Sequence, residues 1–426
     1  MNYTRFLNPV SLARQPSPIR VLTAILARSP PSMISLAAGS PNVDLFPFKE
    51  AEIKLRDGTT MHLDEKKMKT ALQYGATPGH GDLLKFLKEM QKTLHNPPTF
   101  DRPPDEGGLD VCVTTGSQDG ICKSMEMLIN PGDNILIDSP TYAGTLAILR
   151  PLGCNMLSVA TDHQGMIPDA LQDVLSRWKP SEKRDPQSSM PRVLYTIPNG
   201  VNPTGASLTL KRKEQIYKIA QDYDLLIMED DPYYFLQYSE RAPTFLSLDV
   251  DGRVLRFDSF SKVLSSGLRV GFVSGPRPLV NRIEMHMMAS VMHTPMMSQM
   301  LVSELLNMWG MDGFLKHVDE VVDFYRDKKD STIKAAEKHL TGLAEWHEPV
   351  AGMFLWMKLK GIEDTKSLIE EKAARKEVLL VPGCAFMADD TAPCPYVRAS
   401  FSLASKENID LGLSRLAALI REEISN

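Results

Sequence analysis

The sequence predicts an α/β protein with a largely parallel β-sheet, followed by a second, smaller α+β domain. Three observations lead to this fold class. From about residue 110, short apolar stretches alternate with longer helical ones, which is typical of repeated β-α units. After about residue 300, helical stretches predominate. The chain is also 426 residues long, more than the roughly 100–200 residues of one ordinary core.

The predicted elements of the larger domain alternate along the chain. Short apolar strands are predicted over residues 111–114, 134–137, 192–196, 225–228, 253–257 and 270–274. The clearest helices predicted between them cover residues 120–129 and 210–223.

The second domain is predicted to begin with a long helix over residues 314–340. A strand over 353–359 and a last helix over 406–424 follow. Two segments of the larger domain, 96–108 and 180–191, are rich in proline and polar residues, and we expect them to be surface connections.

Composition indicates a small-molecule ligand. The net charge is −5, from 48 Lys and Arg against 53 Asp and Glu, without long blocks of one sign, so neither nucleic acid nor a membrane is an expected partner. No apolar run approaches the roughly 18–20 residues of a spanning helix. The cysteines lack the C-x-x-C and histidine spacing of a zinc site, so we expect no metal. We expect reduced, buried thiols in an intracellular protein at Cys112, Cys122, Cys154, Cys384 and Cys394.

The N-terminus has an unusual composition. No acidic residue precedes Asp44, whereas Arg5, Arg14, Arg20 and Arg28 lie among serine and apolar residues. This composition is typical of a mitochondrial transit peptide. The alternative is that the segment is retained and folds over the body of the protein, with a local role for Arg20.

The most informative segment is 259–271, which reads Ser-Phe-Ser-Lys-Val-Leu-Ser-Ser-Gly-Leu-Arg-Val-Gly. It follows a predicted strand, and ligand-binding residues of open α/β sheets lie at strand C-terminal ends. Ser259 and Ser261 offer hydroxyl groups and Arg269 offers a bidentate guanidinium, a set that suits a phosphate. Lys262 is a candidate for imine formation, because burial and cationic neighbours can lower the pKa of its amine. The alternative is a solvated loop lysine.

Two further loops carry candidate ligand-binding groups. In residues 195–205, two prolines and two glycines fix the loop path, and Asn202 can donate to an anionic oxygen. The alternative there is a rigid turn that binds nothing. In residues 228–234, Glu229, Asp230 and Asp231 directly follow an apolar strand, where a carboxylate can keep a ring nitrogen protonated. The alternatives are a helix N-cap and, with no histidine nearby, a less favoured metal ligand.

The order of these segments resembles the class I and II aminotransferases of fold type I, over nearly the whole chain. Residues 116–118 (Gly-Ser-Gln) resemble the family's phosphate-binding helix N-terminus, and 138–142 (Asp-Ser-Pro-Thr-Tyr) resemble its aromatic segment. Residues 73–81 resemble the loop whose tyrosine reaches the cofactor of the partner subunit. Residues 395–401 resemble the strand whose arginine binds the substrate α-carboxylate. Without the resemblance, residues 116–118 could be an ordinary helix start, Tyr142 a core tyrosine and Arg398 a surface arginine.

The resemblance implies a pyridoxal 5′-phosphate (PLP) enzyme that forms a homodimer, with a mainly parallel seven-stranded sheet flanked by helices in its large domain. The implied domains are an N-terminal segment (1–45) that contributes to the small domain and a substrate lid, the large domain (46–300) and the small domain (301–426).

The resemblance also assigns roles to single residues. The implied cofactor-binding residues are Ser117, Gln118, Tyr142, Asn202, Asp230, Tyr233, Ser259, Ser261, Lys262, Arg269 and, from the partner, Tyr74. The implied catalytic residues are Lys262 as imine and proton carrier, Asp230 at the ring nitrogen and Tyr142 stacked on the ring. The implied substrate-binding residues are Arg20, Gly39, Tyr74, Asn202 and Arg398.

One departure from the family pattern narrows the expected substrates. Seven positions separate Lys262 from Arg269, one fewer than in the aspartate-type branch, and this spacing resembles the branch of α-aminoadipate, aromatic and kynurenine aminotransferases. That branch implies amino donors of the kynurenine or 2-aminoadipate type, 2-oxoglutarate as acceptor, a ping-pong mechanism and, from kynurenine, kynurenic acid after cyclisation. A mitochondrial matrix location is favoured over the cytosol.

Other functions remain open on the sequence. A PLP-dependent lyase or synthase, such as a cysteine-conjugate β-lyase, would share these residues, as would another aromatic or broad-specificity aminotransferase. A non-catalytic effector-binding module is disfavoured by the intact Lys262 and by the lack of a preceding DNA-binding domain.

Overall fold

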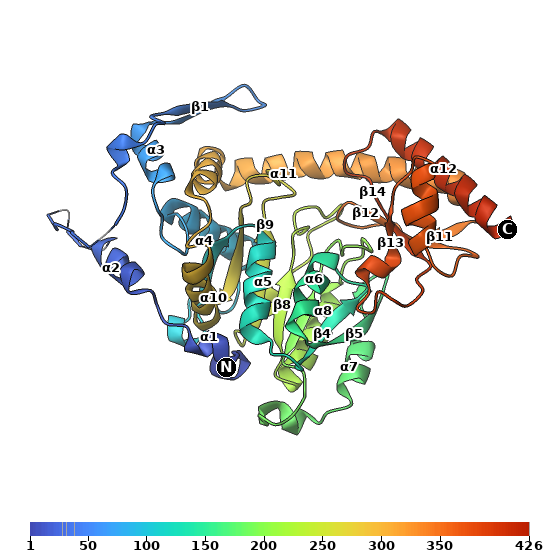
Figure 1. Ribbon diagram of the computed structural model, residues 1–426, viewed down its shortest axis with the longest axis horizontal. Coiled ribbons are helices and arrows are strands. Elements are labelled where there is room, and N and C mark those ends of the chain that lie inside the picture. Colours follow the sequence, from blue (N-terminus) through green and yellow to red (C-terminus); the bar gives the residue numbers. More distant parts are fainter. Residues whose placement is uncertain (28, 31, 38, 426) are drawn as a thin grey trace. The chain divides into compact units, whose positions relative to one another are not determined.

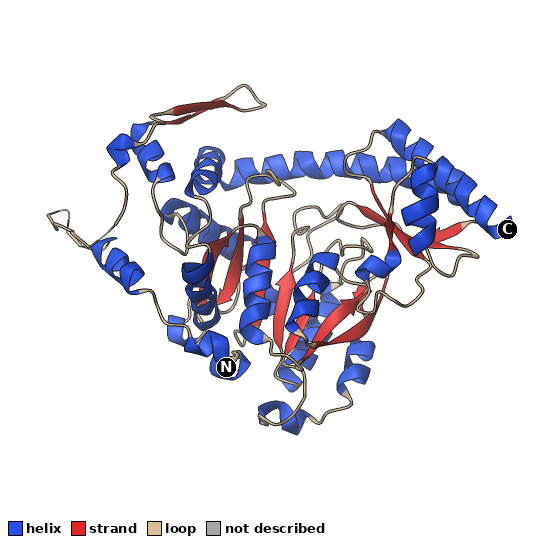
Figure 2. Ribbon diagram, in the orientation of Figure 1, coloured by secondary structure: helices blue, strands red, loops and turns tan. Residues whose placement is uncertain are grey.

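A computed structural model describes residues 1–27, 29–30, 32–37 and 39–425. The chain forms two compact units. Unit 1 contains Met1–Ile129 and Leu246–Lys316, and unit 2 contains Asn130–Phe245 and His317–Asn426. Figures 1 and 2 show the elements of each unit. Within the described ranges, no helix is both long and apolar enough to cross a membrane.

The core of unit 1 is built on three strands, β3 (Leu109–Thr114), β9 (Val254–Ser259) and β10 (Gly271–Pro276). Strand β10 pairs antiparallel with both others, so that Phe272 lies opposite Val113 on β3 and Asp258 on β9. All residues of β9 and β10 are buried, and the two charged side chains of β9, Arg256 and Asp258, form an ion pair at 2.8 Å. The helices packed on these strands are α4 (Gly81–His95), α5 (Ser117–Leu128) and α10 (Arg277–Ser290).

The rest of unit 1 is mostly N-terminal. It consists of η1 (Tyr3–Phe6), α1 (Pro9–Ala13), α2 (Pro18–Ala27), η2 (Val43–Leu45), the hairpin β1 (Ala51–Lys54) and β2 (Thr60–Leu63), α3 (Glu65–Leu72) and η3 (Pro104–Glu106). A short helix, α9 (Phe245–Leu248), begins at the unit boundary. In Figure 1, α2 and the hairpin lie at the periphery of this unit, beyond α4 and α10.

Unit 2 contains parallel β-α units. Strands β4 (Asn134–Ser139), β5 (Asn155–Asp162), β7 (Val193–Thr196) and β8 (Leu226–Asp230) are parallel in the order β5-β4-β7-β8, and the short β6 (Gly165–Met166) pairs antiparallel with β5. The connecting helices are α6 (Ala143–Leu152), α7 (Pro168–Leu175), η4 (Pro180–Arg184) and α8 (Leu210–Asp222).

The C-terminal part of unit 2 has an α+β organisation. Its four-stranded antiparallel sheet has the order β11-β12-β14-β13, formed by β11 (Ala344–Trp346), β12 (Phe354–Leu359), β13 (Val381–Pro382) and β14 (Tyr396–Ser400). The accompanying helices are η5 (Leu368–Ala373), η6 (Gly383–Phe386) and α12 (Lys406–Ser425). The long α11 (Met296–Leu340) contains the unit boundary at residue 316, and Gly310 interrupts its helical backbone with φ of 63°.

Most differences from the predicted elements concern their ends. Strands β8 and β9 each continue two residues past the predicted limits of 228 and 257, so the carboxylates of Glu229 and Asp230 lie in β8 and do not follow it. Polar groups can end a buried strand when partners satisfy them: the backbone N–H of Phe245 donates to Glu229 at 2.8 Å.

The expectation of uniformly buried thiols was wrong in part. All five cysteines are free, and Cys112, Cys384 and Cys394 are buried, but Cys122 and Cys154 are partly exposed. Cys122 lies on α5 and its thiol is 3.6 Å from the Glu126 carboxylate. A single apolar residue in a polar neighbourhood does not reveal from sequence which helix face it occupies.

Candidate active site

Two glycines shape the start of α5 in unit 1. Gly116, at the N-cap position, has φ of 74°, and a Cβ there would lie 2.3 Å from a terminal nitrogen of Arg269. A Cβ on Gly271 would lie 2.5 Å from the backbone nitrogen of Ser117. Only glycine allows β10 and Arg269 to approach the first turn of the helix so closely. The first backbone N–H groups of a helix lack intrahelical acceptors, so this turn can bind an anion.

Arg269 and two serines lie at the same place in unit 1. The Arg269 guanidinium donates to the Ser261 hydroxyl at 3.3 Å, to the Ser266 carbonyl at 3.2 Å and to the Thr115 carbonyl at 3.4 Å. The Ser259 hydroxyl accepts from the backbone N–H of Ser261 at 3.1 Å. Arg269 has φ of 53°, an unusual backbone conformation for a residue other than glycine. A cation, two hydroxyl groups and a helix N-terminus together form a phosphate-binding set.

Lys262 lies in the single turn that follows β9. The turn closes through bonds from the backbone N–H of Leu264 and Ser265 to the Phe260 carbonyl, at 2.9 and 3.2 Å. The buried Phe260 ring contacts those of Phe272 and Phe314, with centroids 5.9 and 6.0 Å away. The aromatic contacts of Phe260 therefore fix the turn that carries Lys262.

Tyr74 lies on the surface of unit 1. Its side chain is 56% exposed, and its ring meets that of His293 edge-on at 6.3 Å. The next residue is held by a bond from the Gly75 N–H to His293 at 3.2 Å. Beside it lies an open hollow of about 810 Å³, which Val43 and Met296 also line.

Asp230 is a buried carboxylate of unit 2. At the end of β8, it accepts a 2.6 Å hydrogen bond from the Tyr195 hydroxyl of the neighbouring strand β7. Burial, with Asp230 adjacent, raises the pKa of Tyr195 well above its ordinary value, so the phenol keeps its proton.

The two neighbouring carboxylates serve the scaffold. Both oxygens of Asp231 accept from the Asn199 amide, at 3.0 and 2.9 Å, and Glu229 holds the Phe245 N–H. A helix N-cap, one alternative for this segment, is not what the structure shows, because Glu229 and Asp230 are strand residues. The described part of the chain also contains no group of three or more His, Cys, Asp or Glu that could hold a metal.

Asn202 and Arg398 meet in unit 2. The Arg398 guanidinium donates to the Asn202 side-chain oxygen at 2.8 Å. Its carbon lies 4.2 Å from the ring centre of Phe354 and 5.0 Å from that of Phe386. Burial lowers the pKa of this guanidinium, and its Nε is buried without a hydrogen-bond acceptor among the described residues. An unsatisfied buried donor of this kind suits a ligand carboxylate.

Glycines also position the loop that carries Asn202. A Cβ on Gly200, which has φ of 55°, would lie 2.8 Å from the backbone nitrogen of Gly352. A Cβ on Gly205, with φ of 70°, would lie 2.6 Å from Pro349. The loop therefore packs directly on residues 349–352, which precede the strand of Phe354.

Two tyrosines complete the expected set in unit 2. The buried Tyr233 ring meets Phe354 edge-on at 5.9 Å, and burial raises the pKa of its hydroxyl. Tyr142 is the N-cap residue of α6, and a Cβ on Gly144 would lie 2.5 Å from its ring. Gly144 thus leaves room for the aromatic ring.

The structure brings the expected residues together in two groups. Unit 1 joins the first turn of α5, at Ser117 and Gln118, to Arg269, Ser261 and Ser259. Unit 2 joins Asn202 to Arg398. Of the expected substrate-binding residues, Arg20 has a side chain that lies outside the described part of the structure. A Cβ on the exposed Gly39 would meet no atom of the described residues within 4 Å.

Sequence analysis did not identify Tyr195 or Phe354 as residues of the site. Tyr195 looked like an ordinary strand residue, and its contact with Asp230 depends on the pairing of β7 with β8. Phe354 lies about 40 residues from Arg398 in sequence, but the alternation of residues along β12 and β14 places it on the face of Arg398. A predicted register for these strands would have revealed that pair.

Known proteins are similar to this chain in both sequence and fold. Residues 31–416 match the family described as aminotransferase class I and II. The chain is 56% identical over 425 residues to the Bos taurus protein named kynurenine/alpha-aminoadipate aminotransferase, mitochondrial, with 100% of both chains covered. The aminotransferase Aro8 from Candida albicans has a similar solved structure, with a TM-score of 0.87 and 29% identity over 100% of this chain and 99% of that one. The kynurenine aminotransferase of Pyrococcus horikoshii, solved with PMP, KYN and KYA, aligns with a TM-score of 0.76 and 27% identity over 99% of this chain and 98% of that one.

Proposed function

The chain belongs to the class I and II aminotransferases, and on this premise we propose that it transfers the amino group of kynurenine- and 2-aminoadipate-type amino acids to 2-oxoglutarate. The cofactor is PLP, and the substrates are amino acids and 2-oxo acids. The observation that carries the substrate class is the 56% identity, over the full length of both chains, to a protein named for these two activities.

The residues of unit 1 fit the phosphate group of PLP. The space that a Cβ would fill at Gly116 and Gly271 is kept open beside the first turn of α5, and Arg269 stands next to it. Backbone N–H groups, hydroxyl groups and a guanidinium are the donors that an anion of this charge requires. We assign the phosphate to Ser117, Gln118, Ser259, Ser261 and Arg269.

Lys262 is the proposed anchor and proton carrier. Bound covalently through this lysine, PLP supplies an electron sink for the substrate carbon that bears the amino group. The amine of Lys262, when it is free, would act as the base that removes the proton from that carbon. The contacts of Phe260 hold the lysine turn in place during this proton transfer.

Asp230 and the tyrosines are the proposed contacts of the cofactor ring. The bond from Tyr195 orients the Asp230 carboxylate, which can then hold a proton on the ring nitrogen and strengthen electron withdrawal. Asn202 and Tyr233 are assigned to the ring's phenolic oxygen, and Tyr142 to stacking on its face.

Arg398 is the proposed ligand of the substrate α-carboxylate. Its fork-shaped guanidinium can give two parallel hydrogen bonds, and the buried Nε supplies a donor for one of them. Asn202 orients one arm of the fork, and Phe354 supports its face. Because every amino acid substrate has this carboxylate, Arg398→Ala should raise KM for all donors.

Arg20 and Gly39 are proposed to contact the distal part of the substrate, as a lid that excludes water. A cationic side chain there would favour a second carboxylate or a polar aromatic ring. Arg20→Ala should therefore raise KM for 2-aminoadipate and kynurenine more than for a short aliphatic donor. Equal changes across donors would remove Arg20 from this role.

A panel of amino donors assayed with 2-oxoglutarate tests the proposed function. We expect equimolar glutamate and 2-oxo acid, with kynurenine and 2-aminoadipate among the best donors, and no turnover without the oxo acid. A PLP-dependent β-lyase would instead release ammonia and a 2-oxo acid from a cysteine conjugate without 2-oxoglutarate. Predominance of that reaction would contradict the proposal.

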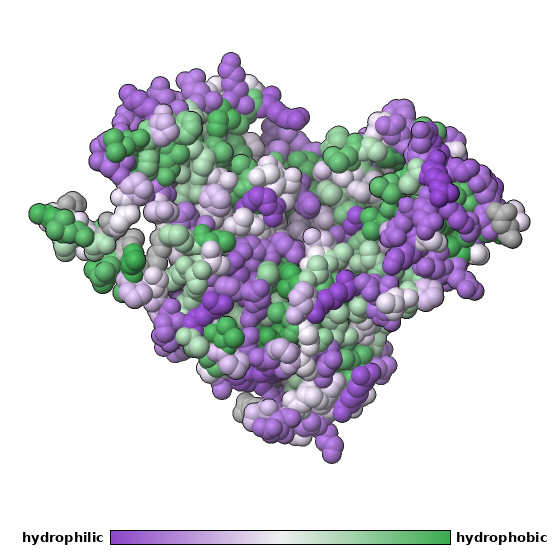
Figure 3. All heavy atoms as spheres, in the orientation of Figure 1, coloured by the Kyte–Doolittle hydropathy of each residue, from purple (hydrophilic) through white to green (hydrophobic). Residues whose placement is uncertain are grey.

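We also propose that the enzyme is a homodimer in which Tyr74 reaches the partner's cofactor. Tyr74 is exposed beside a large hollow. In Figure 3, hydrophobic residues gather along the N-terminal segment of the same unit, and the exposed apolar side chains there include Ile19, Ile25, Ile34, Leu36, Leu45 and Phe48. Such a concentration is typical of a protein–protein interface. Sedimentation equilibrium should give twice the 47.5 kDa chain mass, and a monomer would contradict the dimer.

A mitochondrial location is proposed for the enzyme. The Bos taurus relative is named mitochondrial, and the acid-free N-terminus has the composition of a targeting segment. Fractionation of cells that make the native protein tests this location, which a purely cytosolic distribution would contradict.

A further inference from the structure

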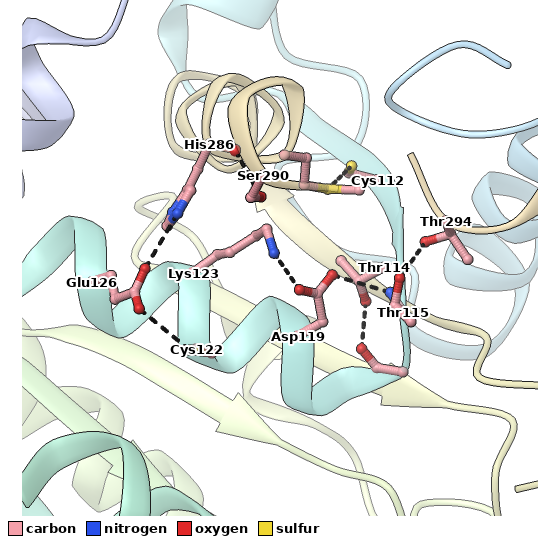
Figure 4. Close-up of polar contacts among 12 residues, drawn as sticks. Cys112, Thr114, Thr115, Asp119, Cys122, Lys123, Glu126, His286, Ser290 and Thr294 are labelled. Carbon is pink, nitrogen blue, oxygen red and sulfur yellow. Dashed lines mark hydrogen bonds and ion pairs between the residues drawn. The ribbon is translucent and has the colours of Figure 1, made fainter. Parts of the chain in front are cut away.

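A buried ion pair lies directly behind the start of α5. Asp119 is the third residue of the helix, and Lys123 follows one turn later on the same face. The Lys123 ammonium donates to the Asp119 carboxylate, and the two side chains are only 7% and 16% exposed. Figure 4 shows Lys123 reaching along the helix toward Asp119. Burying a pair of this kind removes two charges from water, so its position calls for a physical explanation.

The pair is linked to the phosphate-binding group through one residue, Thr115. The second oxygen of Asp119 accepts from the backbone N–H of Thr115 at 3.2 Å, and the carbonyl of Thr115 accepts from Arg269 at 3.4 Å. Arg269 in turn donates to Ser261. The contacts therefore run without a break from Lys123 through Asp119 and Thr115 to Arg269.

The same turn is fixed from its other side. The Thr114 hydroxyl donates to the Gly116 carbonyl at 2.9 Å, and the hydroxyl groups of Thr115 and Thr294 are 3.4 Å apart, as Figure 4 shows. These contacts restrain the peptides that immediately precede Ser117. The position of Arg269 thus depends on a turn whose backbone is held mainly by side chains.

Charge explains why the pair contains a lysine. A carboxylate in the first turn of a helix is favoured by the helix dipole, but it repels a phosphate bound at that turn. The adjacent ammonium of Lys123 compensates the carboxylate, which can then hold Thr115 without weakening anion binding. Removing the ammonium alone leaves a buried, uncompensated negative charge close to the phosphate site.

We propose that Asp119 and Lys123 are positioning residues for the cofactor phosphate: Asp119 fixes the backbone of Thr115, whose carbonyl orients Arg269, and Lys123 neutralises Asp119. The proposal rests on the assignment of the phosphate to this turn under the proposed function. Neither side chain touches the cofactor, so each acts only through Thr115 and through charge.

The test measures the dissociation constants of PLP and of pyridoxal, which lacks the phosphate, for the apo forms of four proteins: wild type, Asp119→Asn, Lys123→Met and the double variant. We expect the PLP dissociation constant to rise about threefold for Asp119→Asn, which keeps a hydrogen-bond acceptor, and about tenfold or more for Lys123→Met. The double variant should bind PLP more tightly than Lys123→Met alone, because the uncompensated charge is gone. Pyridoxal binding should change less than about twofold throughout.

Lys218→Met is the matched control, since Lys218 forms an exposed ion pair with Asp222 at the same spacing on α8. Thermal unfolding of each apo protein shows whether a variant is misfolded. The conservative Lys123→Arg variant keeps the positive charge and should restore PLP affinity. An unchanged PLP constant in folded Lys123→Met, or an equal loss of PLP and pyridoxal affinity, would overturn the proposal.

Inorganic phosphate distinguishes this proposal from the proposed function. Wild-type apoprotein should bind phosphate in competition with PLP, and Lys123→Met should bind it more weakly. If wild type bound phosphate but not PLP, the proposed function would fail, while the phosphate constants of the variants would still decide the role of the pair. Unchanged phosphate binding in Lys123→Met would overturn the positioning role proposed for Asp119 and Lys123.

Discussion

At the scale of single residues, hydrogen-bond partners distinguish the carboxylate that can act on the cofactor from its neighbours. Three carboxylates lie in a row at the end of β8, and the sequence could not rank them by their surroundings. The structure engages Asp231 with Asn199 and Glu229 with a backbone N–H, and it joins Asp230 to a phenol that keeps its proton. The family resemblance had pointed to Asp230. The structure gives a physical reason for this assignment, because the hydrogen bonds of Glu229 and Asp231 already engage those two carboxylates with the protein.

Asp230→Asn should bind PLP and lose most of its activity. An amide cannot hold a proton on the ring nitrogen by charge, so we expect kcat to fall by at least about 100-fold. Asp231→Asn is the control, because it alters the scaffold one residue away. Steady-state kinetics with kynurenine check this, and a kcat for Asp230→Asn within about threefold of wild type would refute the role.

Asp138 should make stability depend on pH. Burial raises the pKa of this carboxyl from 3.8 to about 7, although it accepts hydrogen bonds from the Ile197 N–H and the Thr196 hydroxyl. The folded protein therefore binds this proton more tightly than the unfolded chain does. The resulting stabilisation is complete below about pH 4 and is lost as the pH rises through 7, up to about 4 kcal/mol.

Urea unfolding of wild type and Asp138→Asn checks this contribution. The isosteric amide stays neutral, so the free energy of unfolding of wild type should fall relative to the variant between about pH 4 and pH 7. Comparing the two proteins cancels the titration of other groups. A difference that does not change with pH would mean that Asp138 does not titrate in this range.

At the scale of elements, periodicity located the strands but not their polar ends. Largely buried strands are rich in apolar residues, which is why β3, β7, β9 and β10 could be placed within a few residues. Strand β5 was missed, because it alternates partly exposed and polar residues and lies next to a two-residue partner. The helix predicted over residues 314–340 is only the last part of α11, which begins at Met296; the earlier part, with its break at Gly310, was not predicted.

The N-terminal segment is an element whose role the sequence left open. Phe6 is 1% exposed, and Asn8 caps α5 through bonds from its side-chain amide to the carbonyls of Glu126 at 2.7 Å and Ile129 at 3.1 Å. The Asn8 backbone N–H also donates to the Met127 carbonyl at 2.9 Å. These are the carbonyl groups that a helix end leaves without partners. Residues 3–8 thus belong to the fold of unit 1, which favours their retention in the mature protein.

Asn8→Asp should destabilise the protein. It removes the amide donors and places a negative charge against helix carbonyls, so we expect a loss of about 1–3 kcal/mol in the free energy of unfolding. Asn2→Asp, with the same charge change at an exposed position, should leave stability within about 0.5 kcal/mol. Hydrogen exchange should also be faster in the last turn of α5. Equal stability of the two variants would exclude the cap.

At the scale of the whole molecule, the sequence identified the α/β class, and the structure and the family match confirm it. The order of motifs could be predicted because most of them lie at or just after the end of a strand, where the path of the chain is constrained. The partners of Arg398 could not be predicted, because contacts with Asn202 and Phe354 join positions nearly 200 and about 40 residues away. The domain limits at residues 45 and 300, and the homodimer, stay predictions.

The central claim is that this chain is a PLP aminotransferase whose cofactor is bound through Lys262. The most direct measurement is borohydride reduction of the purified enzyme, followed by digestion and peptide mass spectrometry. We expect one phosphopyridoxyl group on the peptide that contains Lys262, and none there when the enzyme has first been incubated with an amino donor without 2-oxoglutarate. A modified lysine elsewhere in the chain, or labelling of Lys262 that amino donors do not prevent, would contradict the claim.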